Sequence, residues 1–180
     1  ATDGVAVCAA AANQMYVAIV SDGAGGAIIT WYDARNGNDD IYAQRVNASG
    51  TCLWTANGVA LCTAAGGQQS PEICPDGAGG AIVGWRDSRN GNVDVYAQRV
   101  NAFGAVQWTA DGVALCTATG SQTSPKIVSD GAGGVIASWQ DYRSGSNYDV
   151  YAQRVTASGG VSWAANGVDV CATAGNRGAP

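Results

Sequence analysis

The chain contains three copies of one sequence unit. The run Asp-Gly-Ala-Gly-Gly begins at Asp22, Asp76 and Asp130, so successive copies start 54 residues apart (76 − 22 and 130 − 76). A tryptophan, then Tyr-Ala-Gln-Arg-Val, then Gly-Val-Ala-Leu-Cys or a close variant follow each run in the same order. A repeat of this length is typical of a ring or a stack of small supersecondary units.

Each copy predicts four short antiparallel strands. In the first copy an apolar run at residues 17–20 leads into the glycine-rich turn, and the next strand covers residues 27–33. An Asn-Gly pair, typical of hairpin turns, separates it from a third strand that starts at Asp40, and residues 58–62 form the fourth. In the second and third copies the first strand lies at residues 73–74 and 127–128, and the second at residues 81–87 and 135–141. The third strand starts at Asp94 and Asp149.

Four strands in about fifty residues is the size of one blade of a β-propeller. Residues 21–42, with Ser-Asp-Gly followed by Trp-Tyr-Asp-Ala-Arg-Asn-Gly-Asn-Asp-Asp-Ile-Tyr, resemble the TolB-like propeller repeat, and residues 75–96 match the same pattern. The resemblance implies blades that bind proteins or build surface assemblies. We therefore expect an all-β protein of three four-stranded, propeller-type blades, with a threefold-closed β-trefoil or β-prism as the alternative.

The three complete units leave additional residues at each end of the chain. Residues 1–8 match only the closing strand of a unit, three units follow, and the last residues match a linker to another unit. Propellers usually have at least four blades, so three units would leave two open flanks. This predicts contact with copies of the chain or with neighbouring repeats. The predicted segments are 1–8, 9–62, 63–116, 117–171 and 172–180.

Composition narrows the range of functions. Charged residues make up 13% of the chain, the net charge is −5, and Lys126 is the single lysine, so nucleic-acid binding is not expected. No apolar run is long enough to span a bilayer. The chain has no histidine and one glutamate, Glu72, so we expect no enzyme. The chain opens without methionine, as a processed exported protein would, and we expect an extracellular or cell-surface location.

Two functions fit this sequence. The first is a structural or binding module in a larger extracellular assembly. The second is a lectin with one weak sugar site per repeat, the sites adding by avidity. The tryptophans are equally expected to pack in the core or between blades, because large rings dominate buried area. The candidate sugar-binding residues are Trp54, Trp108, Trp163, Tyr32, Arg86 and Gln140.

The cysteines form two groups. One group, Cys8, Cys62, Cys116 and Cys171, occupies a repeated slot at the end of an apolar strand and is expected to act as small buried thiols. Cys52 and Cys74 stand where the other copies carry valine, which suggests a disulfide between them. No zinc site is expected without histidine or a Cys-x-x-Cys pair.

The Asp-rich segment from Asp33 to Asp40 has a faint likeness to a calcium loop. It lacks the spacing and the closing glutamate of an EF-hand. We therefore expect no cofactor and interpret the segment as a hairpin turn in which Arg35 pairs with an aspartate.

Overall fold

The computed structural model describes residues 3–171, which form three separate four-stranded antiparallel sheets and, over that range, no helix. The prediction of an all-β protein with three blade-like sheets is confirmed. Sheet 1 contains β1 (Gln14–Ser21), β2 (Ala27–Asp33), β3 (Asp40–Val46) and β4 (Val59–Cys62). Sheet 2 contains β5 (Gln68–Pro75), β6 (Ala81–Asp87), β7 (Asp94–Val100) and β8 (Val113–Cys116). Sheet 3 contains β9 (Gln122–Ser129), β10 (Val135–Asp141), β11 (Asp149–Val155) and β12 (Val168–Asp169).

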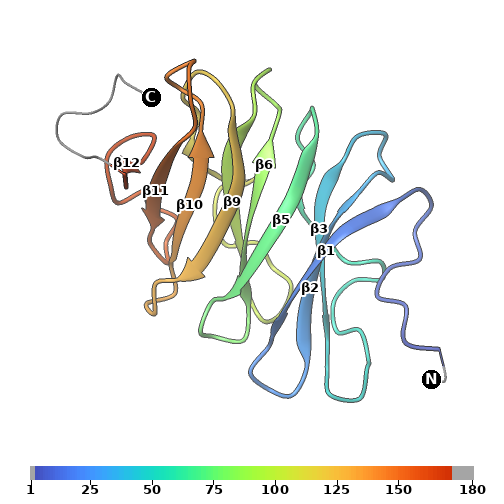
Figure 1. Cartoon of the computed structure of the whole chain (residues 1–180). Helices are drawn as coiled ribbons and strands as arrows, with labels where there is room; N and C mark the ends of the chain where they lie inside the picture. Colours follow the sequence, from blue (N-terminus) through green and yellow to red (C-terminus); the bar gives the residue numbers. More distant parts are fainter. Residues whose placement is uncertain (1–2, 172–180) are drawn as a thin grey trace.

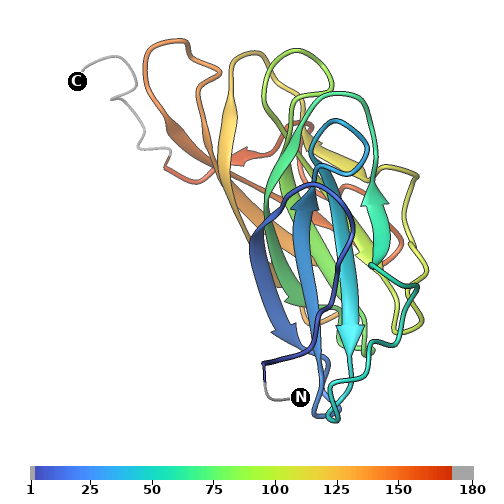
Figure 2. The same ribbon diagram turned by 90° about the vertical axis from the view of Figure 1, so that its right-hand side faces the viewer.

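Within each sheet every strand pairs only with its neighbours in the chain, as in a meander. The first strands of the sheets, β1, β5 and β9, lie next to one another, as the strands around a propeller axis do. Sheets 1 and 3 lie on opposite sides of sheet 2, and the sheets fan out from these first strands (Figure 1). Figure 2 views the same fan from the side of sheet 1. The three sheets do not close on themselves, so the threefold-closed alternative is wrong.

The turn between the first two strands explains why its aspartate and its last glycine recur at the same spacing in all three repeats. The Asp22 carboxylate accepts backbone hydrogen bonds from Ala24 and Gly26, both at 2.8 Å. A Cβ atom at Gly26 would lie 2.1 Å from the carbonyl oxygen of Val46 on β3, so only glycine fits there. The turn is thus held by its own aspartate and packed tightly against the third strand.

The loop between the second and third strands differs from the predicted Asn-Gly turn. Asp33 pairs with Asp40, so the loop spans residues 34–39 and is longer than a two-residue hairpin. Gly37 has φ +98° and donates to the carbonyl of Ala34. The Asn36 side chain donates to the Asp40 carboxylate at 2.8 Å. The glycine therefore ends a turn that begins three residues earlier.

Each first strand is longer than predicted because it contains a bulge. The backbone has φ near +54° at Tyr16, Ser70 and Ser124, at the same point of β1, β5 and β9. The register of β1 against β2 shifts between Met15 and Ala18. The extra residue bends the strand and breaks the regular alternation of side chains.

The hydrophobic core lies between consecutive sheets. One cluster joins Ile28 and Ile41 of sheet 1 to Val83 and Trp85 of sheet 2. A second cluster joins sheet 2 to sheet 3 around Trp139. Sheet 2 is therefore covered on both faces, whereas sheets 1 and 3 are each covered by a sheet on one face only.

The predicted closing strand at the start of the chain is described from residue 3 onward. Residues 3–8 pair with none of the three sheets. Val7 and Cys8 nevertheless pack on Ile29, Trp31 and Tyr42 of sheet 1. The predicted linker at residues 172–180 lies outside the described residues.

Candidate functional site

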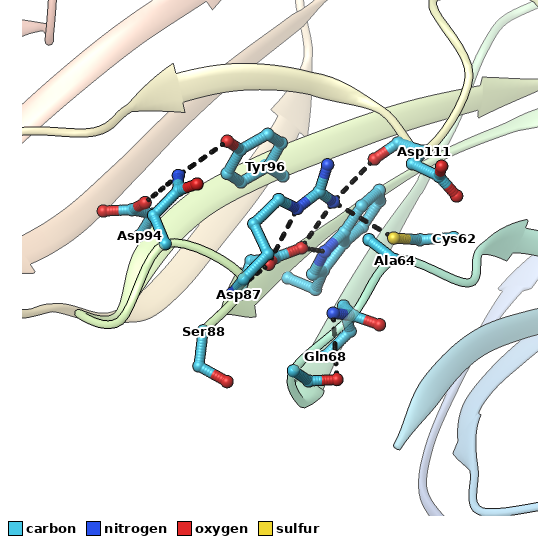
Figure 3. Close-up of polar contacts among 12 residues, drawn as sticks. Cys62, Ala64, Gln68, Asp87, Ser88, Asp94, Tyr96 and Asp111 are labelled. Carbon is cyan, nitrogen blue, oxygen red and sulfur yellow. Dashed lines mark hydrogen bonds and ion pairs between the residues drawn. The ribbon is translucent and has the colours of Figure 1, made fainter. Parts of the chain in front are cut away.

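A buried ion pair sits at the end of the second strand of every sheet. In sheet 2 the Asp87 carboxylate is fully buried and accepts from the Trp85 indole at 2.8 Å. It also accepts from Arg89, whose Nε and Nη2 atoms lie at 2.9 and 2.6 Å. The Arg89 guanidinium lies 4.0 Å from the centre of the Tyr96 ring (Figure 3). The same ion pair joins Arg35 to Asp33 and Arg143 to Asp141, which confirms the predicted arginine–aspartate pairing.

This ion pair also connects one sheet to the next. Arg89 Nη2 lies 3.1 Å from the sulfur of Cys62, which ends β4 of the preceding sheet, and 2.8 Å from the carbonyl oxygen of Asp111. Figure 3 shows Cys62 and Asp111 on one side of the cluster and Tyr96 on the other. Arg143 meets Cys116 in the same way at 3.3 Å. The cluster is thus part of the contact between consecutive sheets, which we call a junction.

The carboxylates of the first and third clusters, Asp33 and Asp141, are suited to hold charge. Burial acts to raise the pKa of Asp33, but hydrogen bonds from Arg35 and Trp31 outweigh it and lower the pKa to about 2. Burial also acts to raise the pKa of Asp141, but hydrogen bonds from Arg143 and Trp139 outweigh it and lower the pKa. Carboxylates held ionised in this way serve as fixed anions and are poor proton donors at neutral pH.

A tryptophan from each of the first two sheets covers the junction. Trp54 donates its indole hydrogen to the carbonyl of Ala102 at 3.1 Å, and Trp108 donates to Ala157 at 3.0 Å. A Cβ atom at Gly104 would lie 2.8 Å from the Trp54 ring, so the ring rests directly on backbone. Gly159 has the same relation to Trp108.

In the first two sheets an arginine on the third strand joins two repeats at the same place. Arg45 binds the Asp22 carboxylate of its own sheet at 2.8 Å and donates to the carbonyl of Ala102 in the next at 3.0 Å. Arg99 repeats both contacts with Asp76 and Ala157. We call the side of a sheet that carries this arginine and the junction tryptophan its outgoing flank, and the opposite side its incoming flank.

The predicted sugar-binding tryptophans are therefore largely junction residues. The exposed fractions of Trp54 and Trp108 are 8% and 7%, whereas Trp163 is 38% exposed. Burial of this kind agrees with the expectation of packing between blades. Nothing in the sequence distinguished the third tryptophan from the other two.

The other three candidate residues occupy one position on β2, β6 and β10. Tyr32 stacks on Tyr16 with ring centres 5.4 Å apart, while Gln140 is exposed. Arg86 contacts Gln69, whose amide contacts Asp39 of the preceding sheet. Gln69 and Arg86 border a hollow on the second repeat, which is lined by Gly67, Gln69, Arg86, Asp87, Ser88 and Val93.

The hairpin loops carry amide–carboxylate bonds. Asn36 and Asn38 donate to the two carboxylate oxygens of Asp40 at 2.8 and 2.9 Å. Asn38 also donates to carbonyls of Ala64 and Gly66, in the linker to the next sheet. These contacts fit the interpretation of the segment as a turn, and they add a further bond across the junction.

Over residues 3–171, no helix is long and apolar enough to cross a membrane.

The structure does not bring the proposed disulfide pair together. All six cysteines are free thiols. Cys74 is buried in the core between sheets 2 and 3, while the Cys52 sulfur lies 3.8 Å from the carbonyl oxygen of Ala6. Of the repeated group, Cys62 and Cys116 are buried as predicted, but Cys8 is half-buried and Cys171 is exposed. The four positions differ in burial because the first and last sheets each have a neighbouring sheet on one side only.

The buried thiols are expected to resist alkylation. Burial raises the pKa of Cys62 and Cys74 to about 12 and that of Cys116 to about 11. Because the thiolate is the reactive form, iodoacetamide at pH 8 should modify the half-buried Cys52 well before these three. Peptide mass spectrometry of the native protein measures the order. In guanidinium without reductant all six should react, and joint protection of Cys52 and Cys74 there would show a disulfide.

No model of a protein family matches the chain, and no curated protein matches it. Among solved structures the chain is similar to the putative TolB from Agrobacterium tumefaciens, with 18% identity and a TM-score of 0.44. That match covers 84% of this chain and 50% of the other, so the chain spans about half the length of that protein. The three separate meander sheets, packed through repeated junctions, are themselves those of a propeller-type fold.

Proposed function

We propose that the protein is a structural, protein-binding module that works through its two open flanks and not through catalysis. The observation that carries this proposal is the identity of the two internal junctions. Each uses an arginine, a tryptophan and a cysteine from one sheet against carbonyls, a glycine and an arginine of the next. The outer flanks carry the same groups, so they are suited to dock a further blade.

The outgoing flank of sheet 3 carries the tryptophan and the arginine that donate hydrogen bonds in a junction, but no further sheet of the described chain covers them. Trp163 is 38% exposed, against 7% for the equivalent Trp108. The Arg154 side chain is 38% exposed, against 18% for Arg99, although it keeps the bond to its own aspartate, Asp130. Covering these groups would bury apolar area and supply an acceptor for the indole.

The incoming flank of sheet 1 is apolar and exposed. Met15, Tyr16, Val17 and Ile19 of β1 are 44%, 63%, 65% and 66% exposed. Contiguous exposed apolar residues of this kind mark protein interaction sites. The module therefore offers one polar–aromatic flank and one apolar flank, which are complementary in the way that consecutive sheets are.

The proposal includes an extracellular or cell-surface location, which the TolB-like repeat pattern of the sequence supports. It includes no enzymatic role, because the buried aspartates, such as Asp87, are held by arginine in ion pairs. Sugar binding is the weaker candidate, since the rings of Trp54 and Trp108 are already covered. Saturable binding on a glycan array that Trp163→Ala abolishes would favour that candidate instead.

A four-repeat chain tests the docking function. Replacing the residues after Cys171 by a copy of residues 63–116 places a new sheet against Trp163 and Arg154. In repeat proteins each added interface contributes to the total stability. We expect the free energy of unfolding, measured by guanidinium denaturation, to rise as the ring of Trp163 becomes buried.

The matched control is the same fusion with Trp163→Ala, which should lose most of the gain. Equal stability of the three- and four-repeat chains, with Trp163 still exposed, would contradict the proposal that the flanks dock blades.

A further inference from the structure

We propose that a second copy of this chain supplies the missing neighbours. Two copies would join head to tail, the outgoing flank of sheet 3 in each against the incoming flank of sheet 1 in the other, and close a ring of six blades. This inference rests on the proposed function and names its partner. It is argued from the two junctions already present within the chain.

The second copy presents the acceptors that the outgoing flank lacks. The carbonyls of Ala102 and Ala157 accept from the junction tryptophan and arginine, and their equivalent in sheet 1 is Ala48, which is exposed. Gly50 is the equivalent of Gly104 and Gly159, on which the tryptophan rings rest; the Val5 side chain lies beside Gly50 in the described chain and would move aside when residues 4–8 join the second copy. Trp163 and Arg154 of one copy therefore find, on sheet 1 of the other, the same partners that Trp54 and Arg45 find on sheet 2.

The apolar side of the junction has the same correspondence. A Cβ atom at Gly84 on β6 would lie 2.9 Å from Ile127 of β9, so this isoleucine packs on the second strand of the preceding sheet. Ile73 of β5 is likewise half-buried against sheet 1. The equivalent residue of β1, Ile19, is 66% exposed. In the ring it would pack on β10 of the second copy, at Ser138.

The start of the chain already fills one slot of the incoming flank. The Cys8 sulfur lies 3.1 Å from Arg35, as Cys62 lies from Arg89. The amide of Ala9 donates to Asn57 at 2.9 Å, as that of Thr63 donates to Asp111. The end of segment 4–8 thus sits where a preceding sheet would place the end of its closing strand.

Those residues can also close sheet 3 of the second copy. β12 is two residues long and pairs with β11 through Tyr151–Asp169 and Ala152–Val168, whereas β4 and β8 are four residues long. The sequence Gly-Val-Ala-Val-Cys at residues 4–8 matches these longer closing strands. In the ring, residues 4–8 would take the place of β12 beside β11, by the strand addition that open sheet edges favour.

The number of repeats selects the size of the ring. Propellers typically have four to eight blades. Two copies of the three described sheets make six blades, a number within that range. Because the two flanks differ, the contact is heterologous and closes after two copies if the rotation per blade suits six.

The mass of the native particle at micromolar concentration tests the proposal directly. Native mass spectrometry and light scattering should give twice the chain mass of 18.1 kDa. A monomer, a trimer or growth into filaments would overturn the six-bladed ring. If the four-repeat fusion is stabilised while the native chain is monomeric, the flanks dock blades but the partner is not a second copy.

Variants on the two flanks test the head-to-tail geometry. Trp163→Ala on the outgoing flank and Ile19→Glu on the incoming flank should each raise the dimer dissociation constant at least tenfold. Phe103→Glu is the matched control, because Phe103 is 89% exposed and lies on neither open flank, and it should leave the dimer intact. Circular dichroism checks that each variant is folded. A dimer sensitive to only one flank variant would show a symmetric contact and overturn the proposal.

Discussion

Replacing Asp87 by alanine should lower the free energy of unfolding by about 3–5 kcal/mol, the cost of leaving a buried charge without its partner. The substitution removes the acceptor of the Trp85 indole and of two Arg89 nitrogens. Arg89 then keeps its charge in a site where its side chain is only 18% exposed. Urea denaturation followed by tryptophan fluorescence measures the loss.

Glu72→Ala is the control for charge removal at a junction. Glu72 pairs with Lys126 across sheets 2 and 3, but the side chains are 35% and 71% exposed. Solvent-exposed pairs of this kind contribute about 0–1 kcal/mol. Similar losses for Asp87→Ala and Glu72→Ala would show that the buried cluster does not stabilise the junction.

Truncating the second junction tryptophan, Trp108→Ala, should cost about 3–5 kcal/mol, as large-to-small changes in a core do. The ring is 7% exposed and rests on Gly159, which has no side chain to fill the space left behind. The indole bond to Ala157 is lost as well. The expected result is an earlier unfolding transition in guanidinium, with sheet 3 separating from sheet 2.

Trp108→Phe separates the two contributions. The phenyl ring keeps most of the apolar contact with Gly159 but cannot donate to Ala157, a loss of about 0.5–1.5 kcal/mol for one hydrogen bond. A destabilisation by Trp108→Phe as large as that by Trp108→Ala would mean that the hydrogen bond, and not the packing of the ring, holds the junction.

The second strands show how much of the fold could be predicted from the sequence. Residues 27–33, 81–87 and 135–141 were expected as strands, and β2, β6 and β10 have these bounds. Each run is bounded by a glycine turn on one side and an aspartate on the other, and both have local structural causes. Local turn chemistry and short apolar runs are enough to locate such elements.

The bulge of the first strands and the exact partner of each junction tryptophan could not be predicted. The bulge at Ser70 and Ser124 precedes Pro71 and Pro125 and hides the first half of β5 and β9, because it breaks the alternation of side chains. The tryptophan contact with a carbonyl 48 residues away is equally non-local. The glycine at position 104, which recurs in each repeat, was the one sequence signal that a tryptophan ring approaches the backbone there. It can equally be interpreted as a simple turn residue.

The meander order of every sheet has a consequence for how the protein folds. Within residues 3–171 each of the twelve strands pairs with a neighbour in the chain, so none of these sheets contains a strand from a distant part of the sequence. Low sequence separation between contacting residues favours fast folding. During synthesis the first blade can form while the third is still being translated, and each later blade then has a finished template to fold upon.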